Sequence, residues 1–368
     1  MTKARELAEL GDTLTVDGSG NITVGGTITG TTITASSALA GSLSTAAQGN
    51  VTSLGTLTGL TVSGNLSVDG GTIKLDGAYP VGTANTALGD AALDSLTSGG
   101  SNVAIGNGTL TANTSGNNNV GMGRRALISN TSGGANVAIG LDSLYSNTTA
   151  SNNTAVGYQA GYSNTTGIRV TAIGYQALNA STASDNTAVG ARAMLSTTSG
   201  ANNTAVGRDA MYTNTTGADN ISVGLNSLFA NTTGSNNAAL GRSALQNNTT
   251  ASNNTAVGYQ AGYSNTTGER NTAVGTQSLY TNTTGSFNTA FGRASMYFNT
   301  TGQENVALGQ DTLFSNSTGS YNVAVGKSAL ETNTTANYNT AVGYQAGLSN
   351  TTGTGNNAFG TQAMRANT

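Results

Sequence analysis

The 368-residue chain contains no cysteine, histidine or tryptophan, and it has a single proline, Pro80. Without cysteine and histidine it lacks the usual ligands of zinc, iron and copper sites, and it lacks disulfides that would indicate a compartment. A nucleophilic serine or threonine would also lack its commonest general base. We therefore expect no metal site, no cofactor and no catalytic residues, and we predict that the protein is not an enzyme.

Charge and long apolar runs are scarce too. Charged residues make up 8% of the chain, the net charge is −3, and only 13 residues are Lys or Arg, which argues against nucleic-acid binding. No apolar run approaches the roughly 20 residues that span a bilayer, so we expect no membrane insertion. The first residues also lack the apolar run and the cleavage pattern of a secretory signal.

Glycine is abundant, with 52 residues, and much of it recurs at a fixed interval. The step is 17 residues, with a single step of 16 between Gly174 and Gly190. The series is Gly89, Gly106, Gly123, Gly140, Gly157, Gly174, Gly190, Gly207, Gly224, Gly241, Gly258, Gly275, Gly292, Gly309, Gly326, Gly343 and Gly360. A period of this size predicts a solenoid, and strict apolar columns outweigh a composition that alone would suggest disorder.

Each coil can be numbered from its glycine, which is position 0, with negative positions before it and positive positions after it. Position −1 is always apolar, as at Val156, and position −2 is Ala in 15 coils, as at Ala155. Neighbours in a strand point to opposite faces, so a strand that is apolar or small on both faces is predicted to be covered on both.

The residues after the glycine predict a second short strand in each coil. Position +3 is small and position +4 is Leu or Met in 14 coils. The other three coils have glycine at +4 and a large residue at +5, as in Gly161 and Tyr162, which suggests a steric slot that the two positions share.

Asparagine occupies position −4 in 16 coils and position +7 in 14, the latter mostly as Asn-Thr-Thr-Gly. Asn and Gly tolerate left-handed turn conformations, and stacked Asn side chains can form amide ladders. We interpret the Asn-x-Thr triplets as this turn motif rather than as glycosylation sites. A calcium-binding solenoid is the rival interpretation of a glycine-rich repeat, but no position of this repeat is held by Asp.

Two motifs of the repeat resemble known families. Asn-Val-Ala-Ile-Gly at 102–106 and Asn-Thr-Ala-Val-Gly at 153–157 resemble the head repeats of trimeric autotransporter adhesins, which are left-handed parallel β-rolls of three chains with shorter coils. Tyr-Gln-Ala-Gly-Tyr-Ser-Asn-Thr-Thr-Gly at 158–167 and 259–268 resembles the repeats of bacteriophage virion fibre proteins. The resemblance covers residues 85–368, implies a homotrimeric shaft and carries over no catalytic residue.

The chain divides into three predicted segments. Residues 1–11 have helix-like apolar spacing and form either a short helix or a frayed terminus. Residues 12–84 contain alternating segments such as 13–16, 21–24 and 65–68, separated by Asp-Gly turns, which predict an irregular β region. This region resembles the amino-terminal part of the same phage proteins, which implies attachment to other virion proteins. Residues 85–368 form the solenoid, for which either a capping protein or a cleaved precursor is expected.

Aromatic residues at positions +1 and +5 are the surface feature that suggests binding. The candidates for recognition of a host glycan or protein are Tyr158, Tyr162, Tyr259, Tyr263 and Tyr344. Packing along seams between coils or chains is the alternative role of these rings.

Together these features predict an all-β protein, a parallel β-solenoid of 17-residue coils in a homotrimeric fibre. We expect a structural virion fibre protein on the particle surface that contributes to host attachment. The alternative is a secreted or surface-displayed bacterial trimeric adhesin, located at the bacterial cell surface. A polysaccharide-degrading spike would need clustered carboxylates, and none are apparent in the sequence.

Overall fold

The computed structural model describes residues 14–16, 22–24 and 84–366, which belong to two separate units. In the first unit, β1 (Leu14–Val16) and β2 (Ile22–Val24) pair antiparallel, with Thr15 opposite Thr23. The strand predictions at these two places are confirmed. The helix predicted within 1–11 and the strands predicted between 25 and 83 lie outside the described residues.

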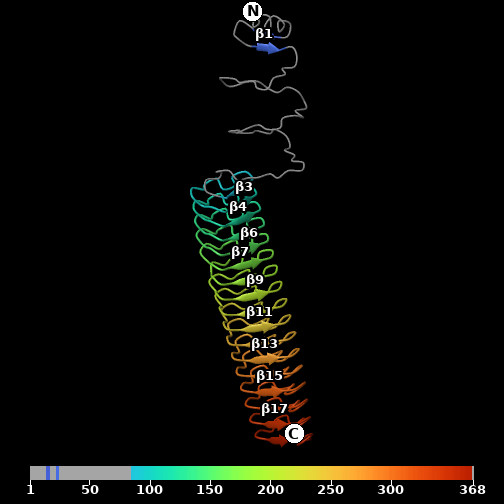
Figure 1. The fold of residues 1–368 in the computed structure, drawn as a ribbon. Coiled ribbons are helices and arrows are strands. Elements are labelled where there is room, and N and C mark those ends of the chain that lie inside the picture. The colour runs from blue at the N-terminus through green and yellow to red at the C-terminus, as the bar shows by residue number, and fades with distance from the viewer. Residues whose placement is uncertain (1–13, 17–21, 25–83, 367–368) are drawn as a thin grey trace, which may run out of the picture. The chain divides into compact units, whose positions relative to one another are not determined.

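The second unit is a parallel β-solenoid, as the period predicts, and Figure 1 shows its coils stacked in one long column. Each coil contributes one three-residue strand at positions −3 to −1. The strands are β3 (Thr86–Leu88), β4 (Val103–Ile105), β5 (Val120–Met122), β6 (Val137–Ile139), β7 (Thr154–Val156), β8 (Thr171–Ile173), β9 (Thr187–Val189), β10 (Thr204–Val206), β11 (Ile221–Val223), β12 (Ala238–Leu240), β13 (Thr255–Val257), β14 (Thr272–Val274), β15 (Thr289–Phe291), β16 (Val306–Leu308), β17 (Val323–Val325), β18 (Thr340–Val342) and β19 (Asn357–Phe359).

Equivalent residues of successive strands lie side by side. Thr255 pairs with Thr272 and Val257 with Val274, and this register holds from β3 to β19. The short coil keeps the register too, since Thr171 pairs with Thr187 although they are 16 residues apart. The missing residue is lost from a turn, where Ser181 replaces the usual Asn and accepts a hydrogen bond from the Ala183 N–H at 3.2 Å.

The prediction of a second strand in each coil is wrong. Positions +2 and +4 have left-handed backbones throughout the solenoid, and at +4 the φ angle lies between 46° and 62°. Such residues cannot continue an extended strand. As a result the neighbouring side chains of Ser143 and Leu144, at +3 and +4, are both buried, whereas neighbours in a strand would point to opposite sides.

The stretch around positions +4 and +6 forms the second wall of each coil, and it still forms backbone hydrogen bonds from one coil to the next. The Leu144 N–H donates to the Ala160 carbonyl at 3.0 Å, and the Ser146 N–H donates to the Tyr162 carbonyl at 3.0 Å. Hydrogen bonds therefore run along the solenoid axis on both walls, although only one wall is a β-sheet.

The shared steric slot is also not what the structure shows. Position +4 faces the core and position +5 faces outward, so the two side chains do not compete for space. A Cβ on Gly161 would lie 3.0 Å from Leu144 Cδ2, so the leucine of the preceding coil reaches the place that a side chain at +4 would take. Glycine at +4 also adopts the left-handed conformation without the cost of about 1 to 2 kcal/mol that other residues incur.

Two asparagine ladders line the turns, as predicted. At position −4, Asn237 donates from Nδ2 to Asn220 Oδ1 at 3.2 Å and to the Ala251 carbonyl at 2.9 Å. At position +7, Asn248 donates from Nδ2 to Asn231 Oδ1 at 2.9 Å and to the same Ala251 carbonyl at 3.0 Å. Both ladders are buried, so each coil supplies the partners that the amides of the next coil require.

Close approach of successive coils explains the glycine at position 0. Gly258 has a φ of 136°, and a Cβ on it would lie 2.6 Å from the Gly275 carbonyl oxygen, which is backbone and cannot move aside alone. Any side chain at this position would push two coils apart.

We predict that Gly258→Ala destabilises the solenoid strongly, because it combines a disfavoured φ with a backbone clash. Thermal unfolding followed by circular dichroism should show a melting temperature lower by several degrees, which corresponds to more than about 2 kcal/mol. Gly262→Ala is the matched control, because a Cβ there meets only the movable Leu245 Cδ2, at 2.9 Å. Equal losses for the two variants would contradict the close-approach explanation.

Candidate interaction surfaces

One outward surface is formed by the sheet itself, at positions −3 and −1, and we call it the strand face. Position −2 points inward and is buried in nearly every coil, whereas position −1 is exposed in twelve coils and half-buried in the other five. Phe291 is 53% exposed and Phe359 is 67% exposed. The apolar residues at −1, which were expected to be covered, are therefore left open in the single chain.

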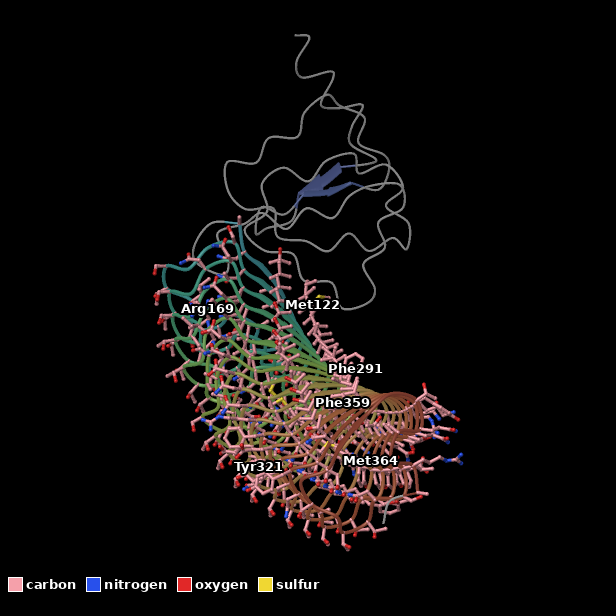
Figure 2. The ribbon with its side chains drawn as sticks, turned by 90° about the horizontal axis from the view of Figure 1, so that it is seen from below. Met122, Arg169, Phe291, Tyr321, Phe359 and Met364 are labelled. Carbon is pink, nitrogen blue, oxygen red and sulfur yellow. The ribbon has the colours of Figure 1, made fainter. Side chains whose placement is uncertain are left out.

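Charge is absent from the strand face. Every Asp, Glu, Lys and Arg between residues 84 and 366 occupies position −6, −5, +1, +2 or +5. In Figure 2, which looks along the stack, Met122, Phe291 and Phe359 of the strand face gather on one side, whereas Arg169 and Tyr321 lie on another. The solenoid thus has one uncharged face, with an apolar stripe at position −1 beside a column at position −3 that is Thr in nine coils, and a separate polar surface.

The polar surface carries ion pairs that connect one coil to the next. Arg125 donates to both carboxylate oxygens of Asp142, at 2.7 and 2.8 Å, and Arg169 contacts Asp185 in the same way, at 2.6 and 2.9 Å. The hydrogen bond and charge of Arg169 lower the pKa of the Asp185 carboxyl. The Arg169–Asp185 pair is exposed and contributes little to stability, whereas the Asp142 carboxylate is buried and needs its partner Arg125.

Aromatic side chains at position +5 stack into ladders along the polar surface. The longest contains Tyr263, Tyr280, Tyr297 and Phe314, with ring centroids 4.9 to 5.3 Å apart and planes within 21° of parallel. Shorter ladders pair Tyr145 with Tyr162 and Tyr212 with Phe229. Inside the longest ladder, Tyr280 and Tyr297 each stack between two rings, so packing accounts for these two residues.

The five tyrosines predicted to take part in recognition do not form one site. At position +5, Tyr162 and Tyr263 are half-buried members of separate ladders. At position +1, Tyr158 stacks on Tyr175 at 5.4 Å, Tyr259 lies 5.9 Å from the Arg242 guanidinium, and Tyr344 is 45% exposed. Their role in recognition stays a prediction.

Within residues 14–16, 22–24 and 84–366, no three His, Cys, Asp or Glu side chains gather into a group that could hold a metal ion. The same residues contain no helix with the length and apolar character that would cross a bilayer.

No protein-family model matches this chain, and no curated protein matches it.

We predict that Tyr280→Ala weakens the solenoid, because it removes two stacked contacts worth about 0.5 to 1.5 kcal/mol each from inside the longest ladder. Thermal unfolding should show a lower melting temperature. Tyr344→Ala, which removes a tyrosine that is 45% exposed, should change it little. A larger effect at Tyr344 would contradict a packing role for the ladder.

Burial, with smaller contributions from Tyr297, Tyr263 and Tyr259, raises the pKa of the Tyr280 phenol above its ordinary value of 10.0. The folded state therefore favours the neutral phenol, and this contribution to stability is present below pH 10 and lost as the pH rises through the raised pKa. We predict that the melting temperature of Tyr280→Phe declines less steeply above pH 10 than that of the unaltered protein. Tyr344→Phe serves as the control, and an identical alkaline decline in all three proteins would refute this assignment.

Proposed function

We propose that this protein is the non-enzymatic shaft of an extracellular fibre, in which three copies lie side by side with their strand faces turned toward a common axis. The observation that supports it best is the strand face, which carries no charge and has an apolar residue at position −1 of every coil along the solenoid. At about 4.8 Å per coil, this stripe is about 80 Å long. Exposed apolar surfaces of this extent are typical of protein interfaces.

The repeat geometry favours another copy of the same chain as the partner. A rigid partner must present apolar groups at the same spacing over the same length to cover successive −1 side chains. An identical solenoid does so at every coil, and closed symmetric assemblies of identical chains are the commonest oligomers. The polar surface, with its ion pairs and aromatic ladders, would then face solvent.

The number of copies and the biological setting rest on the resemblance of the repeat motifs. The adhesin-like and phage-fibre-like motifs both favour three chains, and the phage-like motifs favour a virion fibre with a role in host attachment. In this proposal the amino-terminal segments 1–11 and 12–84 join the shaft to other virion proteins.

The proposal predicts that charge on the strand face prevents assembly. Val206 and Val257 lie at position −1, three coils apart. In the variant carrying Val206→Asp and Val257→Asp, unpaired carboxylates would be buried near the axis, at a cost of several kcal/mol each. Light scattering should give the mass of three chains for the unaltered protein and of one chain for the variant.

A second double variant separates this effect from the effect of added charge in general. Leu225→Asp and Thr276→Asp place the same two carboxylates at position +1 of the polar surface. This variant should keep the mass of three chains, and circular dichroism should show folded solenoids in both variants. An unaltered protein that stays monomeric at high concentration would refute the proposal.

A further inference from the structure

The longest aromatic ladder ends at Phe314. One face of this ring stacks on Tyr297 at 5.3 Å, and Phe298 packs edge-on against it at 5.2 Å. In the next coil, position +5 is held by Glu331, so no aromatic ring covers the other face of Phe314. The stack of rings therefore stops at Phe314, and this half-buried ring lines open space beside Glu331.

A surface groove of about 280 Å³ lies at this ladder end. It is lined by Phe314 together with Arg293, Asp311 and Glu331. Arg293 donates to both oxygens of Asp311 at 3.1 Å, and the Gln310 amide donates to Asp311 Oδ2 at 2.8 Å, so the Asp311 carboxylate is held in place. Among the described residues, the Glu331 carboxylate has no ion pair.

The groove thus combines one apolar platform with a guanidinium donor and two carboxylate acceptors. Small-molecule sites commonly pair an apolar wall with a few polar groups that fix orientation. A pyranose ring matches this arrangement, because its C–H face can lie on an aromatic ring while its hydroxyl groups donate to carboxylates and accept from a guanidinium. We propose that this groove binds a neutral pyranose unit of a glycan.

Hydrogen-bonding capacity decides between a cationic and a neutral ligand. The Arg293 guanidinium is paired with Asp311, so the groove keeps the negative charge of Glu331 and would also attract an ammonium group. An ammonium group has no acceptor for the N–H groups of Arg293. A neutral polyol uses the donor and the acceptors together.

The groove is also compatible with the assembled shaft. Its residues occupy positions +1, +2 and +5, away from the strand face, so the groove would stay open in the proposed trimer. The inference deepens the attachment role proposed above and rests on that role for its biological meaning. The binding itself requires only a folded solenoid.

The test is saturation-transfer NMR on the full chain with methyl pyranosides of gluco, galacto, manno and N-acetylglucosamine type. At least one should bind, with the strongest transfer to its ring C–H protons, and a titration should give its affinity. Phe314→Ala should weaken this affinity by about ten-fold or more, a change of about 1.4 kcal/mol. Glu331→Gln leaves the aromatic ladder intact and should weaken the affinity for the pyranoside several-fold. If Phe314→Ala does not fold, the affinity of Glu331→Gln tests the proposal.

Phe229→Ala is the matched control, because Phe229 is also the last ring of a ladder but is followed by Gln246 and does not line the groove. The affinity of the Phe229→Ala variant for the pyranoside should stay within about two-fold of the affinity of the unaltered protein. The proposal is overturned if none of the four pyranosides binds, if binding survives both groove substitutions, or if n-butylammonium displaces the sugar. Light scattering on the same samples distinguishes failure of the glycan proposal from failure of the trimer proposal. If the protein is a trimer but binds no pyranoside, only the glycan site is refuted.

Discussion

The whole solenoid depends on how closely each coil approaches the next. At position 0 the backbones come so near that a Cβ on Gly258 would sit 2.6 Å from the next coil's carbonyl oxygen. That spacing allows in-register pairing of the strands, the coil-to-coil hydrogen bonds of the second wall and the hydrogen bond from Asn237 to Asn220. Each of these contacts needs a neighbour at one fixed distance, which is why the coils are stable as a stack.

The same spacing gives the outer surfaces their character. Because every coil repeats at the rise of a β-ladder, like side chains line up in columns, and a column of aromatic residues at position +5 becomes a stack of rings. A column of apolar residues at position −1 becomes a continuous stripe. Charge is confined to positions outside the strand face, where Arg125 and Asp142 can pair across coils. In our proposals, assembly uses the strand face and ligand binding uses the polar surface.

Much of this architecture is predictable from the sequence, because a 17-residue period in glycine, alanine and asparagine leaves few alternatives to a solenoid. The second wall is not, since nothing in a Leu or Met at +4 indicates that Leu144 adopts a φ of 46°. Sequence reasoning did single out the aromatic columns, and its choices include Tyr263, the ring at the other end of the longest ladder, which stacks on Tyr280. The groove at Phe314 has a sequence signal, the end of an aromatic run in one column, but its lining by Arg293 depends on the fold. The number of chains, the virion setting and the segment boundaries at residues 11 and 84 stay predictions.

The central claim is that three solenoids meet through their strand faces, and cryo-electron microscopy of the native particle tests it most directly. Averages viewed down the shaft should show three solenoid profiles around one axis, with the flat sheet of each profile turned inward and the aromatic wall outward. A single profile would contradict the claim, and so would three profiles whose aromatic walls meet at the centre.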